Sequence, residues 1–308
     1  MKNLLYALVL VIAFNSNSYS QENSTFYTDK DGEKHLCGPF ELNLLLNDTT
    51  FSNWYKESLE DYDIQVENTP WKKALEETEV DIYLGTWCGD SKNWVPKFVK
   101  LWEELGLKQE QLHFIALYDG DEKYKQSPNG EEVGKNIHRV PTFIFKKNGE
   151  EIARIVESPA NDLLTDLAHI SLGYPSAPNY KGANYLMNLI AEKGLKEIKN
   201  NFKEHVNKVY RLQQSSAELN TLGYVYLRSG KIDEALMVFY MNMLCYRYNP
   251  NMYDSYAEAL EVQGNDKAAL QYYKIALEKE PKSEHALERI EVLEKKLAEE
   301  EQDEELEE

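Results

Sequence analysis

The stretch Tyr83–Pro96, YLGTWCGDSKNWVP, decides the fold because a strand pattern turns into a helix pattern within it. The apolar run from Val80 to Leu84 predicts a buried strand. Apolar residues then recur at three- and four-residue spacing from Trp94 to Leu105, which predicts a helix. Cys88 lies between the two, in the first turn of that helix. Unpaired backbone N–H groups and the helix dipole favour a thiolate there, so Cys88 is the candidate nucleophile.

Strands and helices alternate from about residue 61 to residue 172, which predicts a mixed central sheet flanked by helices. Residues 21–60 are set apart as an N-terminal extension, with a hairpin around the turn Asp29–Gly32 and a helix over Phe51–Leu59. The other predicted elements are a strand Ile64–Val66, a helix begun by Thr69 and Pro70, a strand Leu112–Leu117, a hairpin of Thr142–Phe145 with Ile152–Val156, and a helix Pro159–Ile170.

A proline opens the strand that follows Arg139. Proline is tolerated at the start of a strand, and a cis peptide bond between Val140 and Pro141 is expected in such a turn. The segment Val140-Pro141-Thr142 is therefore the second candidate part of the site.

These two segments together resemble the thioredoxin-like superfamily. Trp87-Cys88-Gly89-Asp90-Ser91-Lys92 is similar to its WCGPCK box, and Pro96 is similar to the proline eight residues beyond the first cysteine. Val140-Pro141-Thr142 resembles its cis-proline loop, and Lys147–Glu150 its last hairpin. The variant TWCGDSK also resembles exported proteins of Bacteroidetes-type bacteria. The resemblance covers about residues 61–172 and implies a thioredoxin-like α/β domain that exchanges disulfides through Cys88, with Pro141 in the substrate groove.

Three departures change the chemistry that the resemblance implies. Ser91 replaces the resolving cysteine, and Asp90 replaces a proline with a carboxylate that opposes a thiolate, which Lys92 can offset. Ile82 stands where the superfamily has a buried acid, and Asp81 is one step out of register, so it faces the other side of the sheet. What remains is monothiol exchange: Cys88 forms a mixed disulfide, Ser91 donates a hydrogen bond to the sulfur, and an external thiol or Cys37 releases the product.

The other cysteines and the histidines give weaker signals. Cys37 is either a disulfide partner of Cys88 or a buried thiol, and both readings stay open. Cys245 lies in an apolar helix and is expected to pack in a core. His35 and His138 lack a spaced ligand set, so no metal and no cofactor is expected.

The last third of the chain repeats itself. Three pairs of residues recur 34 residues apart: Gly230 with Gly264, Ala235 with Ala269, and Phe239 with Tyr273. This helix-pair period is the tetratricopeptide signature. After a linker, 173–183, an all-α repeat domain is predicted over 184–298, with clear repeats at 216–249 and 250–283. Such repeats form a concave surface that suits a protein or peptide partner.

The composition of the chain limits where the protein can be located and which partners it can bind. Residues 1–20 read as a signal peptide, with Lys2 before the apolar run Leu4–Phe14, so a periplasmic or extracellular protein is expected, with no membrane span in the mature chain. The net charge of −19 disfavours nucleic acid as a partner. Residues 299–308 hold eight acids and predict a disordered tail.

Three hypotheses follow. The first is an exported monothiol oxidoreductase or isomerase whose repeats bind a protein partner. The second is a non-catalytic adaptor that binds peptides with the same domain and repeats. In the third, Cys37 and Cys88 form a regulatory or structural disulfide. The retained tryptophan, cysteine and prolines favour the first, and the missing second cysteine favours the second.

Overall fold

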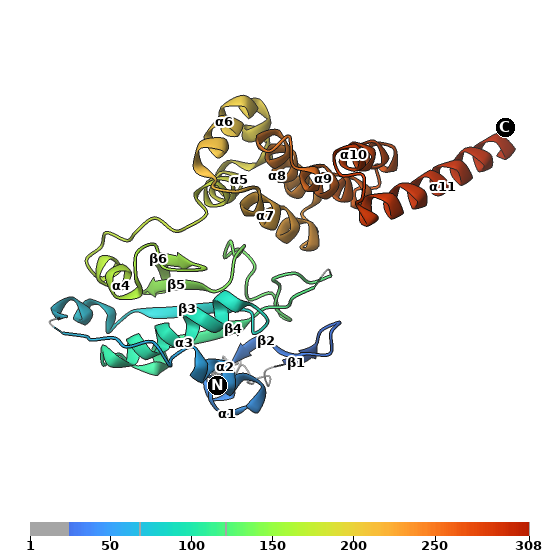
Figure 1. The fold of residues 1–308 in the computed structure, drawn as a ribbon. Helices are drawn as coiled ribbons and strands as arrows, with labels where there is room; N and C mark the ends of the chain where they lie inside the picture. The colour runs from blue at the N-terminus through green and yellow to red at the C-terminus, as the bar shows by residue number, and fades with distance from the viewer. Residues whose placement is uncertain (1–24, 68, 121, 308) are drawn as a thin grey trace, which may run out of the picture.

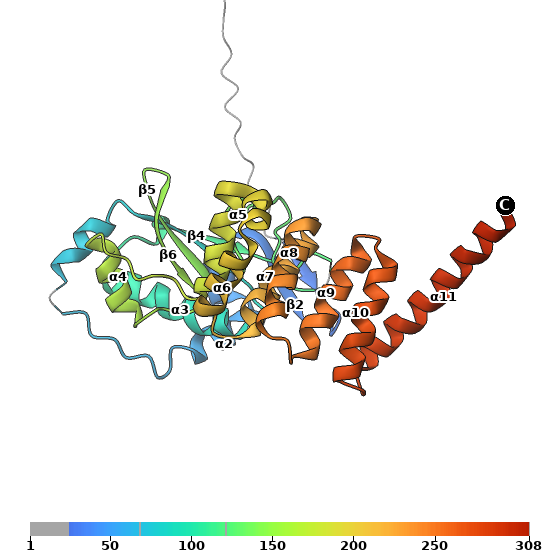
Figure 2. The same cartoon turned by 90° about the horizontal axis from the view of Figure 1, so that it is seen from above.

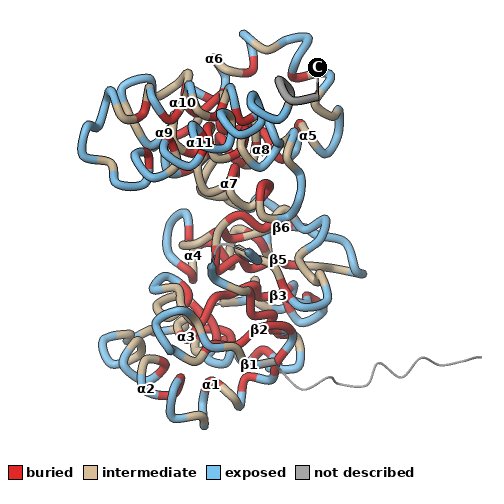
Figure 3. The backbone as a smooth tube through the Cα atoms, turned by 90° about the vertical axis from the view of Figure 1, so that its right-hand side faces the viewer, coloured by how far each residue is buried: buried red, intermediate tan, exposed pale blue. Residues whose placement is uncertain are grey.

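The computed structural model describes residues 25–67, 69–120 and 122–307 (Figure 1). The predicted signal peptide, residues 1–20, lies outside the described residues. The chain forms a mixed sheet flanked by helices and, after it, an all-helical region, which confirms the predicted fold class. Buried residues form separate centres in the two parts (Figure 3).

The described residues contain one sheet of six strands in the order β1-β2-β4-β3-β5-β6. The central strands β3 and β4 run parallel, and the other neighbours are antiparallel. A parallel pair inside an antiparallel frame brings the carboxyl ends of β3 and β4 to the same edge. The strands are β1 Thr25–Thr28, β2 Lys34–Phe40, β3 Glu79–Leu84, β4 Leu112–Ala116, β5 Thr142–Lys147 and β6 Glu150–Val156.

The two faces of the sheet are covered differently. Val80, Ile82 and Leu84 alternate onto one face, where helices α2, α3 and α4 pack against them in the larger core. Tyr83 points to the other face, where it packs with residues from the loop 117–140. The flanking helices are α1 Asn43–Asn47, α2 Thr49–Glu57, α3 Gly89–Glu104 and α4 Leu163–Ser171, with short 3₁₀ turns η1 Pro70–Leu75 and η2 Gln109–Gln111.

The predicted N-terminal hairpin is confirmed, and the structure joins it to the central sheet. Strand β2 pairs with β4, with Gly38 opposite Ala116. Its residues Leu36 and Cys37 are fully buried, which explains why this apolar segment joins the sheet. The predicted strand Ile64–Val66 is wrong, because these residues are irregular and β2 already occupies the edge of β4. Pro70 opens a 3₁₀ turn rather than the predicted α-helix.

The helices of this region pack against one another, and α7 with α8 and α9 with α10 form the most extensive pairs. The small residues Ala235 and Ala269 are fully buried, as are the aromatic residues Phe239 and Tyr273, so equivalent positions pack equivalently and the region is consistent with repeats. Its helices are α5 Lys181–Asn200, α6 Phe202–Leu212, α7 Ser216–Arg228, α8 Ile232–Cys245, α9 Pro250–Val262, α10 Asp266–Lys279 and α11 Glu284–Glu307.

The segment 299–308 was predicted to be a disordered tail, whereas the backbone of α11 is helical as far as Glu307 and projects from the molecule (Figures 1 and 2). Buried Ile290 and Leu293 anchor the first half of this helix. Glutamate is a good helix former, and extending an anchored helix avoids the cost of nucleation. Across the described ranges, no helix is both long and apolar enough to cross a membrane.

Candidate active site

Cys88 stands where β3 passes into α3. It is the N-cap of the helix, with φ −85° and ψ 126°, and it is half-buried. The turn before it is tight, since a Cβ at Gly85 would lie 2.5 Å from the Trp87 ring. The Trp87 Nε1–H donates a hydrogen bond to the Leu117 carbonyl at 2.9 Å. Trp87 follows β3 and Leu117 follows β4, so this hydrogen bond holds the indole between the ends of the two parallel strands, next to Cys88 in the sequence.

The loop before β5 faces the thiol. The Cys88 Sγ lies 3.3 Å from the carbonyl oxygen of Val140, to which the thiol donates. The Val140–Pro141 peptide bond is cis, as predicted. Thr142 is buried, and its hydroxyl donates to the Arg139 carbonyl at 2.7 Å, which holds the loop. The two segments selected from the sequence therefore meet at the sulfur.

The other residues of the box spread around α3. Ser91 is fully buried and its Oγ accepts a hydrogen bond from the Gly85 amide at 3.2 Å. The hydroxyl therefore supports the turn, and its own donation to the Cys88 sulfur stays a prediction. Gly89 and Asp90 are exposed, and Lys92 is half-buried. Pro96 is a buried residue inside the helix.

Cys37 lies on β2 and is fully buried. Its side chain hydrogen-bonds with Tyr118, and burial together with this bond raises the pKa of Tyr118 to about 12. Cys37 and Cys88 are both thiols in this structure, so their pairing stays a prediction. Burial also raises the pKa of the Cys245 thiol to about 11, which suits the predicted packing role.

One curated relative decides the family. No protein-family model matches the chain. Over 114 residues, which are 35% of this chain and 74% of the relative, the sequence is 31% identical to thioredoxin H9 from Arabidopsis thaliana. The chain belongs to the thioredoxin family.

In this thioredoxin-family protein an isoleucine occupies the strand position at which the sequence resemblance implies a buried acid. Ile82 is fully buried in the helix-covered core. Asp81 points to the opposite face and pairs with Lys146, whose Nζ lies 2.7 Å from Asp81 Oδ1. The Asp81 carboxylate is therefore paired with a lysine on the face opposite Ile82, in agreement with its register in the sequence.

Lys125 is a site residue that the sequence did not indicate. It lies in the loop 117–140, and 4% of its surface is exposed. Its Nζ lies 3.8 Å from the ring centroid of Tyr124 and 5.8 Å from that of Trp87. Burial lowers the pKa of Lys125 to about 7, and the Arg139 charge adds to this effect while the Cys88 charge opposes it. No motif or spacing marks a single lysine in a polar loop, so only the fold places it near the thiol.

An ion pair flanks the same site. Arg139 contacts Glu157 through an N–O distance of 3.2 Å. Burial raises the pKa of Glu157, Arg139 opposes that rise, and the Asp90 charge adds to it. The site therefore combines two basic side chains with two acidic side chains: Lys125, Arg139, Asp90 and Glu157.

A cavity of about 470 Å³ lies between the loop 117–140 and the helical region. On one side it is lined by the loop after β4, including Tyr124, whose ring lies 6.5 Å from that of Trp87. A second cavity of about 330 Å³ shares Tyr224, Glu258 and His285 with the first. The first cavity is lined by Asp119, Gly120, Tyr124, Asn220, Thr221, Tyr224, Arg228, Glu258 and His285.

Proposed function

We propose that this protein exchanges disulfides through the single thiol of Cys88. One observation carries the proposal: the half-buried sulfur at the N-cap of α3 faces the Val140 carbonyl, beside Pro141. A substrate chain that lies along this loop would bring its disulfide to the sulfur. The helix N-terminus stabilises the negative charge that attack requires.

The exchange is redox-neutral. The Cys88 thiol first loses its proton, and we assign Lys125 to hold that proton, since it is buried against Trp87 and its pKa is close to 7. The thiolate attacks one substrate sulfur, the substrate S–S bond breaks, and the other sulfur leaves as a thiolate. Because Ser91 has no sulfur, an external thiol must attack the mixed disulfide to release the product.

Trapping of the mixed disulfide tests this proposal. The protein with residues 1–20 removed is mixed with a peptide disulfide, without added thiol, and analysed by mass spectrometry. We expect one peptide adduct that maps to Cys88 and persists. The variant Cys88→Ser should lose the adduct, and the matched control Cys245→Ser should keep it. An adduct that survives in Cys88→Ser, or none at all in the unmutated protein, would rule out exchange at Cys88.

The helical region is the part we assign to a protein partner. Its tetratricopeptide-like pairs present α7 and α9 toward the cavity, and Tyr224 and Glu258 lie in both cavities. A peptide bound in this cavity would contact Tyr124, whose ring centroid lies 6.5 Å from that of Trp87. The repeats would thus hold a substrate protein while its disulfide reaches Cys88.

An adaptor without catalysis is the second candidate. The cavity favours it, because its polar lining includes neither Cys88 nor Ser91. The two candidates separate in one experiment, in which a partner is identified by crosslinking and its affinity for Cys88→Ser is measured. Equal affinity together with loss of the partner's disulfide exchange supports catalysis. Equal affinity with no exchange in the unmutated protein supports the adaptor.

We also propose that the protein is exported after its signal peptide is cleaved. The apolar run Leu4–Phe14 and the small residues before Gln21 support a cleaved signal peptide and a periplasmic or extracellular location. The N-terminal residue of the protein recovered from the producing cell tests this. A start at Gln21 supports export, and a retained Met1 in a cytoplasmic fraction contradicts it.

A further inference from the structure

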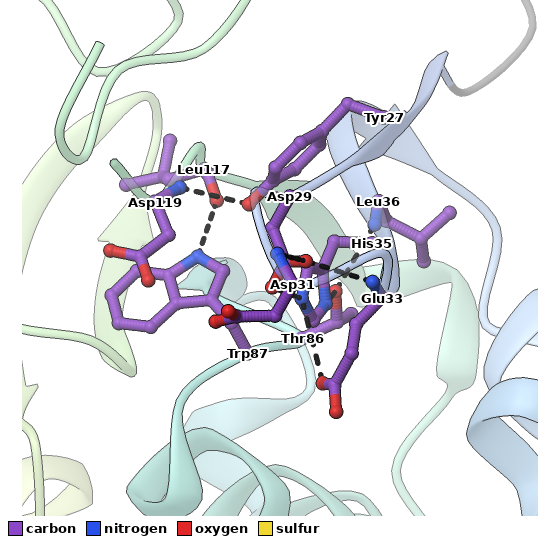
Figure 4. A network of polar contacts seen from close by, with 10 residues as sticks. All are labelled: Tyr27, Asp29, Asp31, Glu33, His35, Leu36, Thr86, Trp87, Leu117 and Asp119. Atoms are coloured by element: carbon purple, nitrogen blue, oxygen red, sulfur yellow. Dashed lines mark hydrogen bonds and ion pairs between the residues drawn. The ribbon is translucent and has the colours of Figure 1, made fainter. Parts of the chain in front are cut away.

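A cluster of three possible metal ligands lies at the β1–β2 hairpin, behind the active-site turn. The side chains of Asp29, Glu33 and His35 offer one ligand atom each, and these atoms lie within 4.8 Å of one another (Figure 4). His35 comes from β2 and is 3% exposed. Asp29 and Glu33 flank the turn at Gly32, which has φ +86°. We propose that these three side chains bind a divalent transition-metal ion, and that zinc is the best fit.

The distances suit a tetrahedral ion. Zinc with nitrogen and oxygen ligands at about 2.0–2.2 Å separates its ligand atoms by roughly 3.3–3.5 Å. The His35 Nε2 lies 3.2 Å from Asp29 Oδ2 and 4.0 Å from Glu33 Oε2. The His35–Asp29 pair at 3.2 Å lies about 0.1 Å below this range, so it needs only a small adjustment. The Glu33 side chain is 71% exposed, so it has room for the remaining movement.

Two groups outside the ligand atoms hold this arrangement. The Asp29 Oδ1 accepts hydrogen bonds from the amides of Asp31 and Glu33, which leaves Oδ2 turned toward His35. The His35 Nδ1 lies 3.3 Å from the Thr86 hydroxyl. Zinc-bound histidines usually donate the proton of their other ring nitrogen to an oxygen of a carboxylate, a backbone carbonyl or a water molecule, and the Thr86 hydroxyl oxygen occupies that position here. On binding, the imidazole would keep its proton on Nδ1 for Thr86 and give the Nε2 lone pair to the ion.

Thr86 links the proposed metal site to the active-site turn. Thr86 Oγ1 also accepts from the Leu36 amide at 3.1 Å, and the next residue is Trp87. Tyr27 of the same hairpin accepts from the Asp119 amide at 2.9 Å, close to the Leu117 carbonyl that holds Trp87 (Figure 4). An ion would therefore fix the hairpin against the end of β3 that carries the active-site turn.

Zinc titration tests the site. All proteins carry Cys88→Ser, because an accessible thiol also binds zinc, and calorimetry measures zinc alone as the ligand. We expect one equivalent to bind and Glu33→Gln to weaken binding by at least about tenfold, since it removes a ligand and its charge. Glu150→Gln is the matched control, because Glu150 is an exposed glutamate at the hairpin on the opposite edge of the sheet. It should bind zinc as before.

A second readout separates binding from folding effects. In a proton–nitrogen correlation spectrum of the imidazoles, zinc should shift the His35 Nε2 resonance and leave the proton on Nδ1. The site is ruled out if zinc shows no saturable binding, if Glu33→Gln and Glu150→Gln bind it equally, or if the His35 resonances do not respond.

Discussion

Ser91 occupies the position at which a second cysteine could resolve a mixed disulfide formed by Cys88. Its side chain is fully buried three positions after Cys88 on α3, and it accepts from the Gly85 amide. In Ser91→Cys a second sulfur stands near the first and attacks the mixed disulfide. We expect the adduct lifetime without external thiol to fall at least about tenfold, measured by quenched-flow mass spectrometry. Ser91→Ala is the control and should leave the adduct long-lived; an unchanged lifetime in Ser91→Cys would contradict the proposed geometry.

Lys125 makes stability depend on pH in a definite direction. Its pKa is about 7 in the folded protein, against about 10.4 for an unperturbed lysine. Between these values the unfolded chain binds more protons than the folded protein, so this lysine makes stability rise as pH rises through that window. We therefore expect Lys125→Met to increase the unfolding free energy most at about pH 6, with the gain shrinking toward about pH 10.

Urea unfolding of both proteins at the two pH values measures this effect. Lys123→Met is the matched control, since Lys123 is an exposed lysine of the same loop. Its stability difference from the unmutated protein should be small and similar at both pH values. A gain from Lys125→Met that is equal at both pH values would show that packing, rather than charge burial, is responsible.

At the scale of elements, the close packing of α7 against α8 in the helical region depends on one small residue. A Cβ at Gly223 of α7 would lie 2.4 Å from the ring of Phe239 on α8, and Phe239 is 1% exposed. Alanine gains helix propensity over glycine, by up to about 1 kcal/mol. The clash should outweigh that gain, because overpacking a core costs roughly 1–3 kcal/mol. We expect Gly223→Ala to be destabilising.

Chemical denaturation measures the change, and a second substitution identifies its cause. Phe239→Leu provides space at the ring, so adding it to Gly223→Ala should cost less than the sum of the two single changes. Gly89→Ala is the control, because nothing lies within 4 Å of a Cβ at that exposed position. Additive effects of Gly223→Ala and Phe239→Leu would contradict the proposed contact.

Elements were predictable where one pattern was strong enough by itself. The apolar run of β3 and the apolar spacing of α3 need no distant partner to be recognised. The segment Ile64–Val66 also has a strand pattern, yet it is irregular, because pairing depends on which sheet edge is open. In α11 the charge pattern suggested disorder, while anchoring by Ile290 and Leu293 allowed the helix to continue.

At the scale of the whole molecule, a few polar contacts join the sheet to the helical region. Arg139 donates to the Ala217 carbonyl at 2.9 Å and lies 4.6 Å from the Tyr180 ring centroid. Gln126 donates to the Arg228 carbonyl at 2.7 Å. We expect the double variant Gln126→Ala/Arg139→Met to loosen this arrangement and increase the radius of gyration in solution X-ray scattering.

Faster proteolysis of the connection between α4 and α5 should accompany that change. Arg154→Met is the matched control, because Arg154 is paired with Glu151 and its bonds stay on the sheet side. It should leave the scattering and the cleavage rate unchanged. An unchanged radius of gyration in the double variant would show that other contacts hold the two parts together.

The sequence by itself determined where the candidate thiol Cys88, its helix and the proline loop lie, because each rests on residues that are neighbours along the chain. It also determined the 34-residue spacing from which helix pairs were predicted, since spacing is a property of the sequence. Only the tertiary structure decided that β2 completes the sheet, that Lys125 is buried beside Trp87, and that His35 faces Asp29 and Glu33. The first two relations join segments that lie far apart along the chain. The third lies within one hairpin, but it requires that His35 is buried against Thr86, which is distant in the sequence. Burial and charge proximity arise only when that packing exists.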